Sequence, residues 1–300
     1  MIYTLTLNPS LDYVMEMDNF TKGKMNRSKN AYLLPGGKGI NVSCVLSALE
    51  MENTAILPVA GFTGEKLLQM LSKKGLSYEA VKLSEGDTRI NVKVLGQEET
   101  ELNAMGPSFS KEEKDCLMEK CEGLGMDDVL ILSGSVPSDL GTAFYARIME
   151  RLKDKKVKVV LDTIGESFLK ALSYKPFLVK PNAEELKELF GTGEADRNEL
   201  ISLAKKVREM GAENVLVSLG SEGAFLLKEN GEVIYETAPK GRVMNTVGAG
   251  DSMVAGFVAG YLKSGDYPMA LRMGIAAGSA SAFSKNLATK EEMDALMKNL

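Results

Sequence analysis

The sequence predicts an α/β fold in three layers: a mostly parallel β-sheet covered by helices on both faces, with a small β lid. Short runs rich in β-branched residues alternate with segments whose apolar residues recur at helical spacing. Two further segments interrupt this alternation, because they have strand patterns with no helix between them. The 300 residues contain no repeat and no long linker, so we expect one domain over residues 1–300.

The expected elements follow one another as strand and helix along most of the chain. The first strand, residues 2–7, stops at the turn signal Asn8-Pro9. The other expected strands are 55–62, 129–132, 157–161, 177–179 and 215–219, and the expected helices are 41–49, 65–74, 143–153, 183–190 and 198–210. A hairpin is expected at 223–237, and helical pattern continues from Thr246 to the end. Such alternation indicates a parallel sheet with both faces covered.

The lid is expected from two inserted segments, at about 11–34 and 87–104. Residues 89–94 alternate polar and apolar side chains, which is typical of a strand with one wet face. A small sheet that stands off the main domain has free edges, and free edges usually need cover. We therefore expect a homodimer that forms through the lid.

Composition and charge narrow the classes of function. Hydrophobic residues make up 44% and charged residues 26% of the chain, as in an ordinary globular protein. The net charge of -5 argues against a nucleic-acid partner. The longest apolar run is far short of the ~20 residues that span a membrane, so no membrane partner and a cytoplasmic location are expected.

The residue types that are missing or few also restrict the chemistry. The chain has no histidine, which excludes Ser-His-Asp and Cys-His nucleophiles and zinc held by histidine. Proton transfer must then depend on carboxylates, lysine or tyrosine. The cysteines Cys44, Cys116 and Cys121 lack the paired spacing of metal or redox sites and fit a reducing cytosol.

The strongest single motif is NTVGAGDS at residues 245–252, just before an apolar helical run. Small residues at a helix start leave several backbone N–H groups free to face one anion, and the helix dipole adds to the attraction. Asp251 would lie in the first turn, where a carboxylate can take the proton of an attacking hydroxyl. The alternative is that Asp251 only caps the helix after a glycine turn.

The motif PGGKGIN at residues 35–41 has three glycines in four positions. Glycines let the main chain approach a ligand closely, and a helix opens at Asn41. Lys38 and Asn41 can then face hydroxyls or phosphate. A flexible turn with an exposed lysine is the alternative.

Two further motifs follow later strands. In KPNAEE, residues 180–185, a proline at the helix start places Asn182 and Glu185 one turn apart on one face. An amide and a carboxylate at that spacing can hold Mg²⁺ through water, or can simply begin the helix. The glycine-punctuated SLGSEG, residues 218–223, leaves a strand and is suited to a nucleotide site or to a plain turn.

Taken together and in this order, the motifs resemble those of the ribokinase-like carbohydrate kinases, in particular the phosphofructokinase B branch. The likeness runs from Met1 to about Asn286 and includes Asn-Pro-x-x-Asp at residues 8–12. Within the branch, residues 88–93 and 250–256 most resemble the 1-phosphofructokinase group. Leu287 and Ala288 follow Asn286, where relatives usually carry glycine, so the adenine pocket is expected to differ in detail.

The resemblance implies a role for each site residue. Asp251 would be the general base, and the amides of Gly248, Ala249 and Gly250 would form the anion hole for the γ-phosphoryl of ATP. The sugar phosphate would contact Asp12, Lys24, Gly36, Gly37, Lys38, Asn41, Arg89, Asn91, Asn103 and Ser135, with Lys24, Arg89 and Ser135 at its phosphate. ATP would contact Lys180, Asn182, Ser218, Gly220, Ser221, Gly223 and Asn286, and Mg²⁺ would be held by Asn182 and Glu185.

The expected reaction is the ATP-dependent phosphorylation of fructose 1-phosphate to fructose 1,6-bisphosphate. A ketofuranose has a CH₂O group at both ends, so fructose 6-phosphate can enter in the opposite sense, and tagatose 6-phosphate differs at one stereocentre. Both remain alternatives. A non-catalytic sugar-phosphate sensor is a rival that the base candidate and the metal pair disfavour, and a dinucleotide oxidoreductase lacks Gly-x-Gly-x-x-Gly after the first strand.

Overall fold

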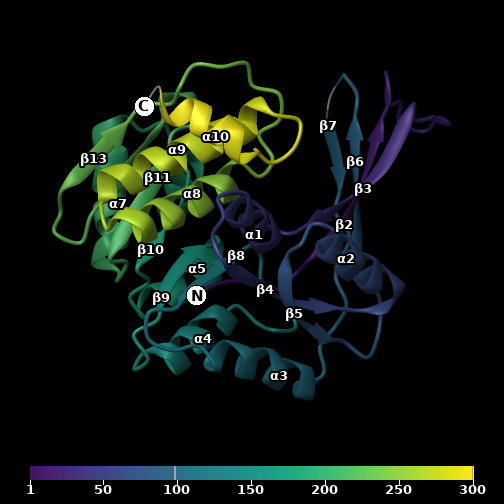
Figure 1. Cartoon of the computed structure of the whole chain (residues 1–300), viewed down its shortest axis with the longest axis horizontal. Helices are drawn as coiled ribbons and strands as arrows, with labels where there is room; N and C mark the ends of the chain where they lie inside the picture. Colours follow the sequence, from purple (N-terminus) through teal and green to yellow (C-terminus); the bar gives the residue numbers. More distant parts are fainter. Residues whose placement is uncertain (98, 299) are drawn as a thin grey trace.

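The computed structural model describes residues 1–97, 99–298 and 300, and contains a large sheet and a small one (Figure 1). Within these residues the large sheet has nine strands in the order β13-β12-β11-β10-β9-β8-β1-β4-β5. Their bounds are β1 Ile2–Thr6, β4 Asn53–Val59, β5 Ser77–Lys82, β8 Val129–Ser133, β9 Lys158–Asp162, β10 Leu178–Val179, β11 Asn214–Ser218, β12 Ala224–Leu227 and β13 Val233–Glu236. The seven strands from β11 to β5 in this order pair in parallel. The last two are antiparallel, β12 to β11 and β13 to β12.

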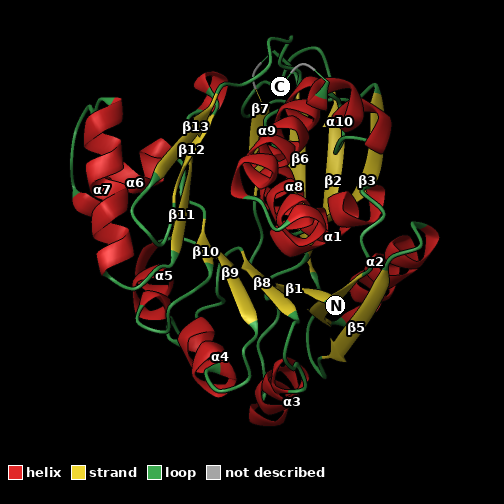
Figure 2. Cartoon of the chain, turned by 60° about the vertical axis from the view of Figure 1, so that its left-hand side comes forward, coloured by secondary structure: helices red, strands yellow, loops and turns green. Residues whose placement is uncertain are grey.

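Helices cover both faces of the large sheet, as Figure 2 shows. One face carries α1 (Lys38–Ala48), α8 (Ala249–Ser264), α9 (Tyr267–Phe283) and α10 (Lys290–Met297). The other carries α3 (Lys111–Glu122), α4 (Phe144–Leu152), α5 (Gly165–Leu172), α6 (Ala183–Phe190) and α7 (Arg197–Glu209), while α2 (Gly61–Lys73) packs beside β4 and β5. Strand residues alternate between the two cores, which is why β8, with core residues on each side, is buried along its whole length.

Helix α8 lies deep in the protein because small residues let it approach α9 closely. Its residues Asp251 to Gly260 are all buried. A Cβ added to Gly256 would lie 2.4 Å from the carbonyl oxygen of Met273, and one added to Gly260 would lie 2.8 Å from the Cα of Ala270. The close packing fixes the first turn of α8 over the sheet.

The small sheet forms the lid and stands beside the main domain (Figure 1). Its strands are β2 (Ser10–Glu16), β3 (Asn30–Gly36), β6 (Arg89–Leu95) and β7 (Glu99–Leu102), in the order β3-β2-β6-β7. The central pair β2 and β6 is parallel, and both outer pairs are antiparallel. Strand β3 lies at one end of this order, so its outer edge has no partner strand within the described residues.

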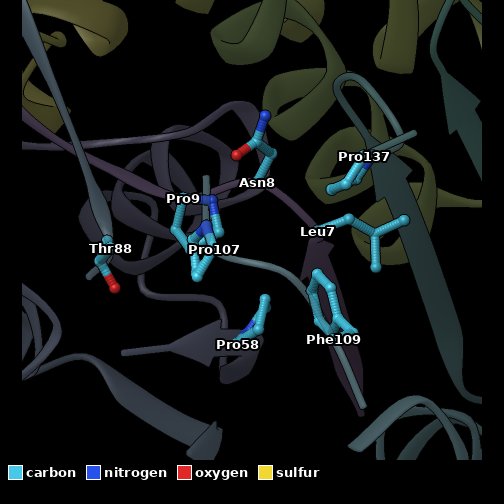
Figure 3. A pocket seen from close by; sticks show the side chains of 8 residues that line it. All are labelled: Leu7, Asn8, Pro9, Pro58, Thr88, Pro107, Phe109 and Pro137. Atoms are coloured by element: carbon cyan, nitrogen blue, oxygen red, sulfur yellow. The ribbon is translucent and has the colours of Figure 1, made fainter. Parts of the chain in front are cut away.

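Prolines stiffen the junction between the lid and the main domain. Figure 3 shows Pro9, Pro58, Pro107 and Pro137 around a small cavity beneath the connections that enter and leave the lid. The cavity holds about 10 Å³, room for roughly one water molecule, so it is no substrate site. Thr88 locks the same junction, because its backbone and side chain bond to Ala60.

The predicted fold class is confirmed, while several element predictions need correction. The predicted strand 55–62 ends at Val59, because Gly61 already begins α2, and the predicted helix 41–49 begins earlier, at Lys38. Strand β5 and helices α3 and α5 were not predicted from the sequence. In α3 only Leu117 and Cys121 are buried, so its apolar stripe is too narrow to show a period.

Among the described residues, no helix combines the length and the apolar character needed to cross a bilayer.

Candidate active site

The candidate site lies at the edge of the large sheet where its parallel strands end. Thr6, Ser133 and Asp162 are in register on neighbouring strands β1, β8 and β9, so their side chains share one face. Lys180 directly follows β10, the next strand. The hydroxyls of Thr6 and Ser133 are buried and have no hydrogen-bond partner in the described structure. Polar groups therefore gather at the edge where ligands bind in open α/β sheets.

The start of α8 is built as predicted from the glycine motif. Gly248 precedes the helix with φ 80°, a left-handed conformation that favours glycine. Among the described residues no side chain caps α8, so the alternative in which Asp251 caps the helix is not what the structure shows. The amide of Ala249 donates to the carbonyl of Thr246, at 3.2 Å, while the first turn otherwise leaves amides for another acceptor.

Asp251 is 5% exposed and is held by one side chain from α1. The amide nitrogen of Asn41 donates to its carboxylate at 2.8 Å. Lys180 is close by as well, since a Cβ added to Gly250 would lie 3.3 Å from its ammonium nitrogen. The structure thus brings together the glycine turn of α8, the start of α1 and the lysine after β10.

Asp162 anchors the two lysines of this site. Its carboxylate is 3.3 Å from the ammonium of Lys38 and 3.4 Å from that of Lys180. The side chain of Asp162 is 2% exposed and that of Lys180 is 5% exposed, whereas Lys38 is 40% exposed and faces the opening. Buried charges need partners of this kind.

Burial and neighbouring charges shift the proton affinities of these groups in opposite directions. Burial raises the pKa of Asp251 to about 6, and the Asp162 carboxylate adds to the rise, while Lys38, Asn41 and Lys180 oppose it. Burial alone would raise the pKa of Asp162 too, but Lys180 and Lys38 outweigh it and hold that pKa below its ordinary value. Two carboxylates with separated proton affinities are typical of an acid–base site.

A second polar cluster lies on the lid face that carries Asp12. One carboxylate oxygen of Asp12 accepts from the hydroxyl of Ser10 at 2.7 Å and from the amide of Asn91 at 3.1 Å. The other oxygen is 3.3 Å from the ammonium of Lys93, which also pairs with Glu101. A Cβ at Gly36 would lie 2.3–2.4 Å from the side-chain oxygens of Ser10 and Asp12, so a larger residue there would displace this hydrogen-bonded pair. Gly37, with φ 126°, requires glycine.

Arg89 lies at the root of the lid and is partly engaged there. Its guanidinium donates twice to the carbonyl of Asn8, at 3.0 and 3.2 Å, and once to that of Ala104, at 3.4 Å. A guanidinium has five N–H donors, so about two are left for a ligand.

Three predicted phosphate or sugar residues lie on the surface. Lys24, Asn103 and Ser135 are exposed. Lys24 lies in the connection between β2 and β3, and the amide of Asn103 donates only to Glu101, at 3.4 Å. Their exposure neither confirms nor contradicts the contacts predicted for them, which remain predictions.

Asn182 and Glu185 form a reciprocal cap at the start of α6. Asn182 accepts from the amide of Glu185, and Glu185 accepts from the amide of Asn182, both at 2.8 Å. The helix-start alternative is therefore realised, but both groups keep oxygen lone pairs, and Glu185 lies near enough to raise the pKa of Lys38 against the effect of burial. Among the described residues, no three acidic, cysteine or histidine side chains form a metal-binding group.

The predicted nucleotide loop follows β11 and borders the same edge. Ser218 bridges to Asn182, which places the loop beside the start of α6. Gly220 and Gly223 have φ 58° and 103°, and Ser221 lies between them in an exposed 3₁₀ turn. Asn286 is exposed, while its neighbour Leu287 lies against Gly248, because a Cβ there would be 2.6 Å from the leucine side chain.

Asp162 and Lys93 belong to these clusters but were missed in the sequence. Asp162 ends the buried strand Val-Val-Leu-Asp, and a lone carboxylate at the carboxyl end of a parallel strand is a usable signal. Lys93 follows Arg89 and Asn91 at intervals of two, so its position on the same lid face was also predictable.

The raised pKa of Asp251 has a cost in stability that can be measured. Its pKa is about 6 in the folded chain against an ordinary 3.8, so its ionisation destabilises the fold as the pH rises through this range. We expect Asp251→Asn to increase the free energy of unfolding at about pH 8 by roughly 1–3 kcal/mol, with the gain shrinking toward about pH 4. Urea unfolding at both pH values measures this. Asp154→Asn, at an exposed site, is the control. If Asp251→Asn is less stable than the unaltered protein at about pH 8, the raised pKa of Asp251 is contradicted.

Comparison with known proteins matches the chain along its length. The sequence model of the pfkB family carbohydrate kinases covers residues 5–293. A 1-phosphofructokinase of Bacillus subtilis is 45% identical, over 99% of this chain and 97% of its own. A D-tagatose-1-phosphate kinase of Bacillus licheniformis is 36% identical, over 98% of this chain and 96% of its own.

A solved structure has the same architecture. Phosphofructokinase-2 of Escherichia coli, in complex with fructose-6-phosphate, superposes with a TM-score of 0.93 at 28% identity, over 100% of this chain and 98% of that one. Since fold, full-length identity and the family model agree, the chain belongs to the pfkB family of carbohydrate kinases, phosphotransferases that act on an alcohol group.

Proposed function

We propose that the protein phosphorylates fructose 1-phosphate with ATP to give fructose 1,6-bisphosphate. The observation that carries this proposal is the buried carboxylate of Asp251, oriented by Asn41 and set in the first turn of an uncapped helix. Such a carboxylate can accept a proton beside a place where an anion is stabilised.

The bond made and the bond broken both lie next to Asp251 in this proposal. The free primary hydroxyl of the sugar attacks the γ-phosphorus of ATP in line, and the bond between that phosphorus and the oxygen bridging to ADP breaks. Asp251 takes the hydroxyl proton as attack proceeds. A pKa of about 6 leaves it ionised at neutral pH yet basic enough to accept that proton.

Cations and backbone donors near the α8 start stabilise the charge on the transferring group. The amides of Gly248, Gly250 and Asp251, with the helix dipole, would face an anion there, while the amide of Ala249 also donates to the carbonyl of Thr246. Lys180 lies against Gly250, and Lys38 lies at the opening of the same cluster. Since these donors are fixed before the reaction, little reorganisation is needed during it.

The lid cluster is proposed to hold the sugar. Asp12 is oriented by three donors, and a carboxylate with about four acceptor positions keeps one for a sugar hydroxyl. Arg89, on the same strand as Asn91, is proposed to bind the phosphate that the substrate already carries, by its two free N–H groups. Closure of the lid would also exclude water from the site.

Mg²⁺ fits the oxygen pair at the start of α6. Asn182 and Glu185 offer amide and carboxylate oxygens, and few protein ligands suit a metal that keeps several of its waters. When bound with ATP, Mg²⁺ would neutralise charge on the phosphate oxygens. Residues 218–223 are proposed to line the nucleotide, beside Asn182. ATP and the three free cysteines fit a cytoplasmic setting.

The names of the relatives favour phosphate on carbon 1. Two relatives at 36–45% identity are named for 1-phosphate substrates, whereas the complex with fructose-6-phosphate is 28% identical. D-Tagatose 1-phosphate is therefore the competing substrate, and it differs from fructose 1-phosphate at one stereocentre, worth a hydrogen bond or two.

Removal of the base should abolish most turnover without loss of fold. We expect Asp251→Asn to lower kcat by roughly 10²–10⁴, because an amide cannot accept the proton. In the unaltered protein kcat/KM should fall as the pH drops through about 6, where Asp251 becomes protonated. ADP release with fructose 1-phosphate, D-tagatose 1-phosphate, fructose 6-phosphate and no sugar measures both. Loss of less than about tenfold would rule out the role.

Truncation of the lid arginine should act on one substrate only. We expect Arg89→Ala to raise KM for the sugar phosphate by roughly 10–100-fold and KM for ATP much less, because charged hydrogen bonds to one phosphate are lost. Arg151→Ala, at an exposed site on α4, is the control. If both KM values rise equally, Arg89 serves only to tie the lid to Asn8 and Ala104.

We also propose that two copies of the chain pair through their lids. A groove of about 670 Å³ between the lid and α2 is mostly apolar; it is lined by Leu11, Tyr13, Leu33, Phe62 and Ile90, and along α2 also by Thr63, Glu65, Lys66 and Gln69. Phe62 is 72% exposed in the single chain, which is unusual for a large aromatic side chain.

A second copy would cover both this groove and the free lid edges. Light scattering should give about twice the chain mass for the unaltered protein and for Met126→Glu, which changes an exposed apolar residue far along the chain from the lid. Phe62→Glu should give about one chain mass at low concentration, because it places a charge in the groove. An unaltered protein of one chain mass would contradict the lid dimer.

A further inference from the structure

We infer that Asp162 is a positioning residue: it fixes Lys38 and Lys180 beside the start of α8 and so keeps Asp251 free of ion pairs and basic. This inference extends the proposed function, because it concerns the same site. Asp162 belongs to none of the motifs that the sequence first indicates.

The geometry gives Asp162 both lysines. One carboxylate oxygen faces the ammonium of Lys38 and the other faces that of Lys180, at 3.3 and 3.4 Å. Strand β9 ends at Asp162, between β8 and β10, so the carboxylate projects from the rigid centre of the sheet. An anchor of this kind holds both ammonium groups in place before a ligand arrives.

Asp251, by contrast, has no ion pair among the described residues, although both lysines influence it. Its one side-chain partner is the neutral amide of Asn41. Lys38 and Lys180 each lower the pKa of Asp251, after the larger raising effects of burial and of Asp162. The lysines therefore lie within electrostatic reach of Asp251 but make their ion pairs with Asp162.

The charged groups that influence Asp251 come from three elements packed against the start of α8, while α9, on the other side of α8, contributes none of them. Strand β9 contributes Asp162, α1 contributes Lys38, and the segment after β10 contributes Lys180. Glu185 of α6 acts more remotely, through its effect on Lys38. With both carboxylates ionised and both lysines charged, the four nearest groups sum to zero.

Removal of the Asp162 charge would change this balance in one direction. Two lysines would then face Asp251 alone, and a carboxylate next to unbalanced cations loses its affinity for a proton. Removal of Lys38 would act in the opposite direction, because it takes a cation away from Asp251. If Asp162 served only to stabilise the fold, its removal and the removal of Lys38 would not be expected to shift the pKa of Asp251 in opposite directions.

The experiment titrates Asp251 directly, without turnover. The protein, labelled with ¹³C at the aspartate carboxyl carbons, is followed by NMR from acid to neutral pH without ligands, and Asp251→Asn identifies the signal. We expect a midpoint near 6 in the unaltered protein. In Asp162→Asn the midpoint should fall by about one pH unit, and in Lys38→Met it should rise. Asp154→Asn, before the other end of β9, should not move it.

The results separate this inference from the proposed function. An unchanged or higher midpoint in Asp162→Asn would overturn the inference, whatever the activity. If that variant does not fold, an unchanged midpoint in Lys38→Met overturns it instead. The acid limb of kcat/KM should shift with the NMR midpoint in each variant. Near-normal turnover of Asp251→Asn would refute the base, and with it the proposed function, while the titrations still decide what Asp162 does.

Discussion

The site depends on the burial of charge at one edge of the large sheet. Close contact between α8 and α9 carries the first turn of α8 over the ends of β8, β9 and β10, and this removes water from Asp251, Asp162 and Lys180. Unpaired burial would cost several kcal/mol for each charge, so the groups must satisfy one another. The two ion pairs of Asp162 and the hydrogen bond from Asn41 are how they do so.

Much of the fold could be predicted, because its signals are local. Buried strands such as Val129–Ser133 are continuous apolar runs, and the glycine before α8 is required by a left-handed backbone. The elements that were missed have weak local signals: β5 is half exposed, and α3 buries only Leu117 and Cys121. Tertiary contacts, and not sequence period, decide such elements.

Most residues of the candidate site were predicted from the sequence, but the residue that pairs with both lysines was not. Asp251, Asn41, Lys38 and Lys180 were all chosen from motifs, yet the residue that links them was not, because Asp162 lies in no motif. A carboxylate at a strand end is a signal in the sequence, but only the sheet order, with β9 between β8 and β10, shows which groups Asp162 reaches. Lys24 and Ser135 are exposed, and the roles that the resemblance implies for them remain predictions.

The two carboxylates and two lysines of this cluster have no net charge when all are ionised. This neutrality explains how one site can bind an anion and still contain a carboxylate that accepts a proton. A site with excess positive charge would attract ATP strongly, but it would also lower the proton affinity of Asp251. A site with excess negative charge would repel the phosphates. In the proposed function Asp162 would resolve this conflict, because its ion pairs with Lys38 and Lys180 balance their charge until the phosphate oxygens of ATP arrive and share the lysine donors. The lysines would then need little movement, and preorganised charge of this kind is usually the largest contribution that a protein makes to phosphoryl transfer.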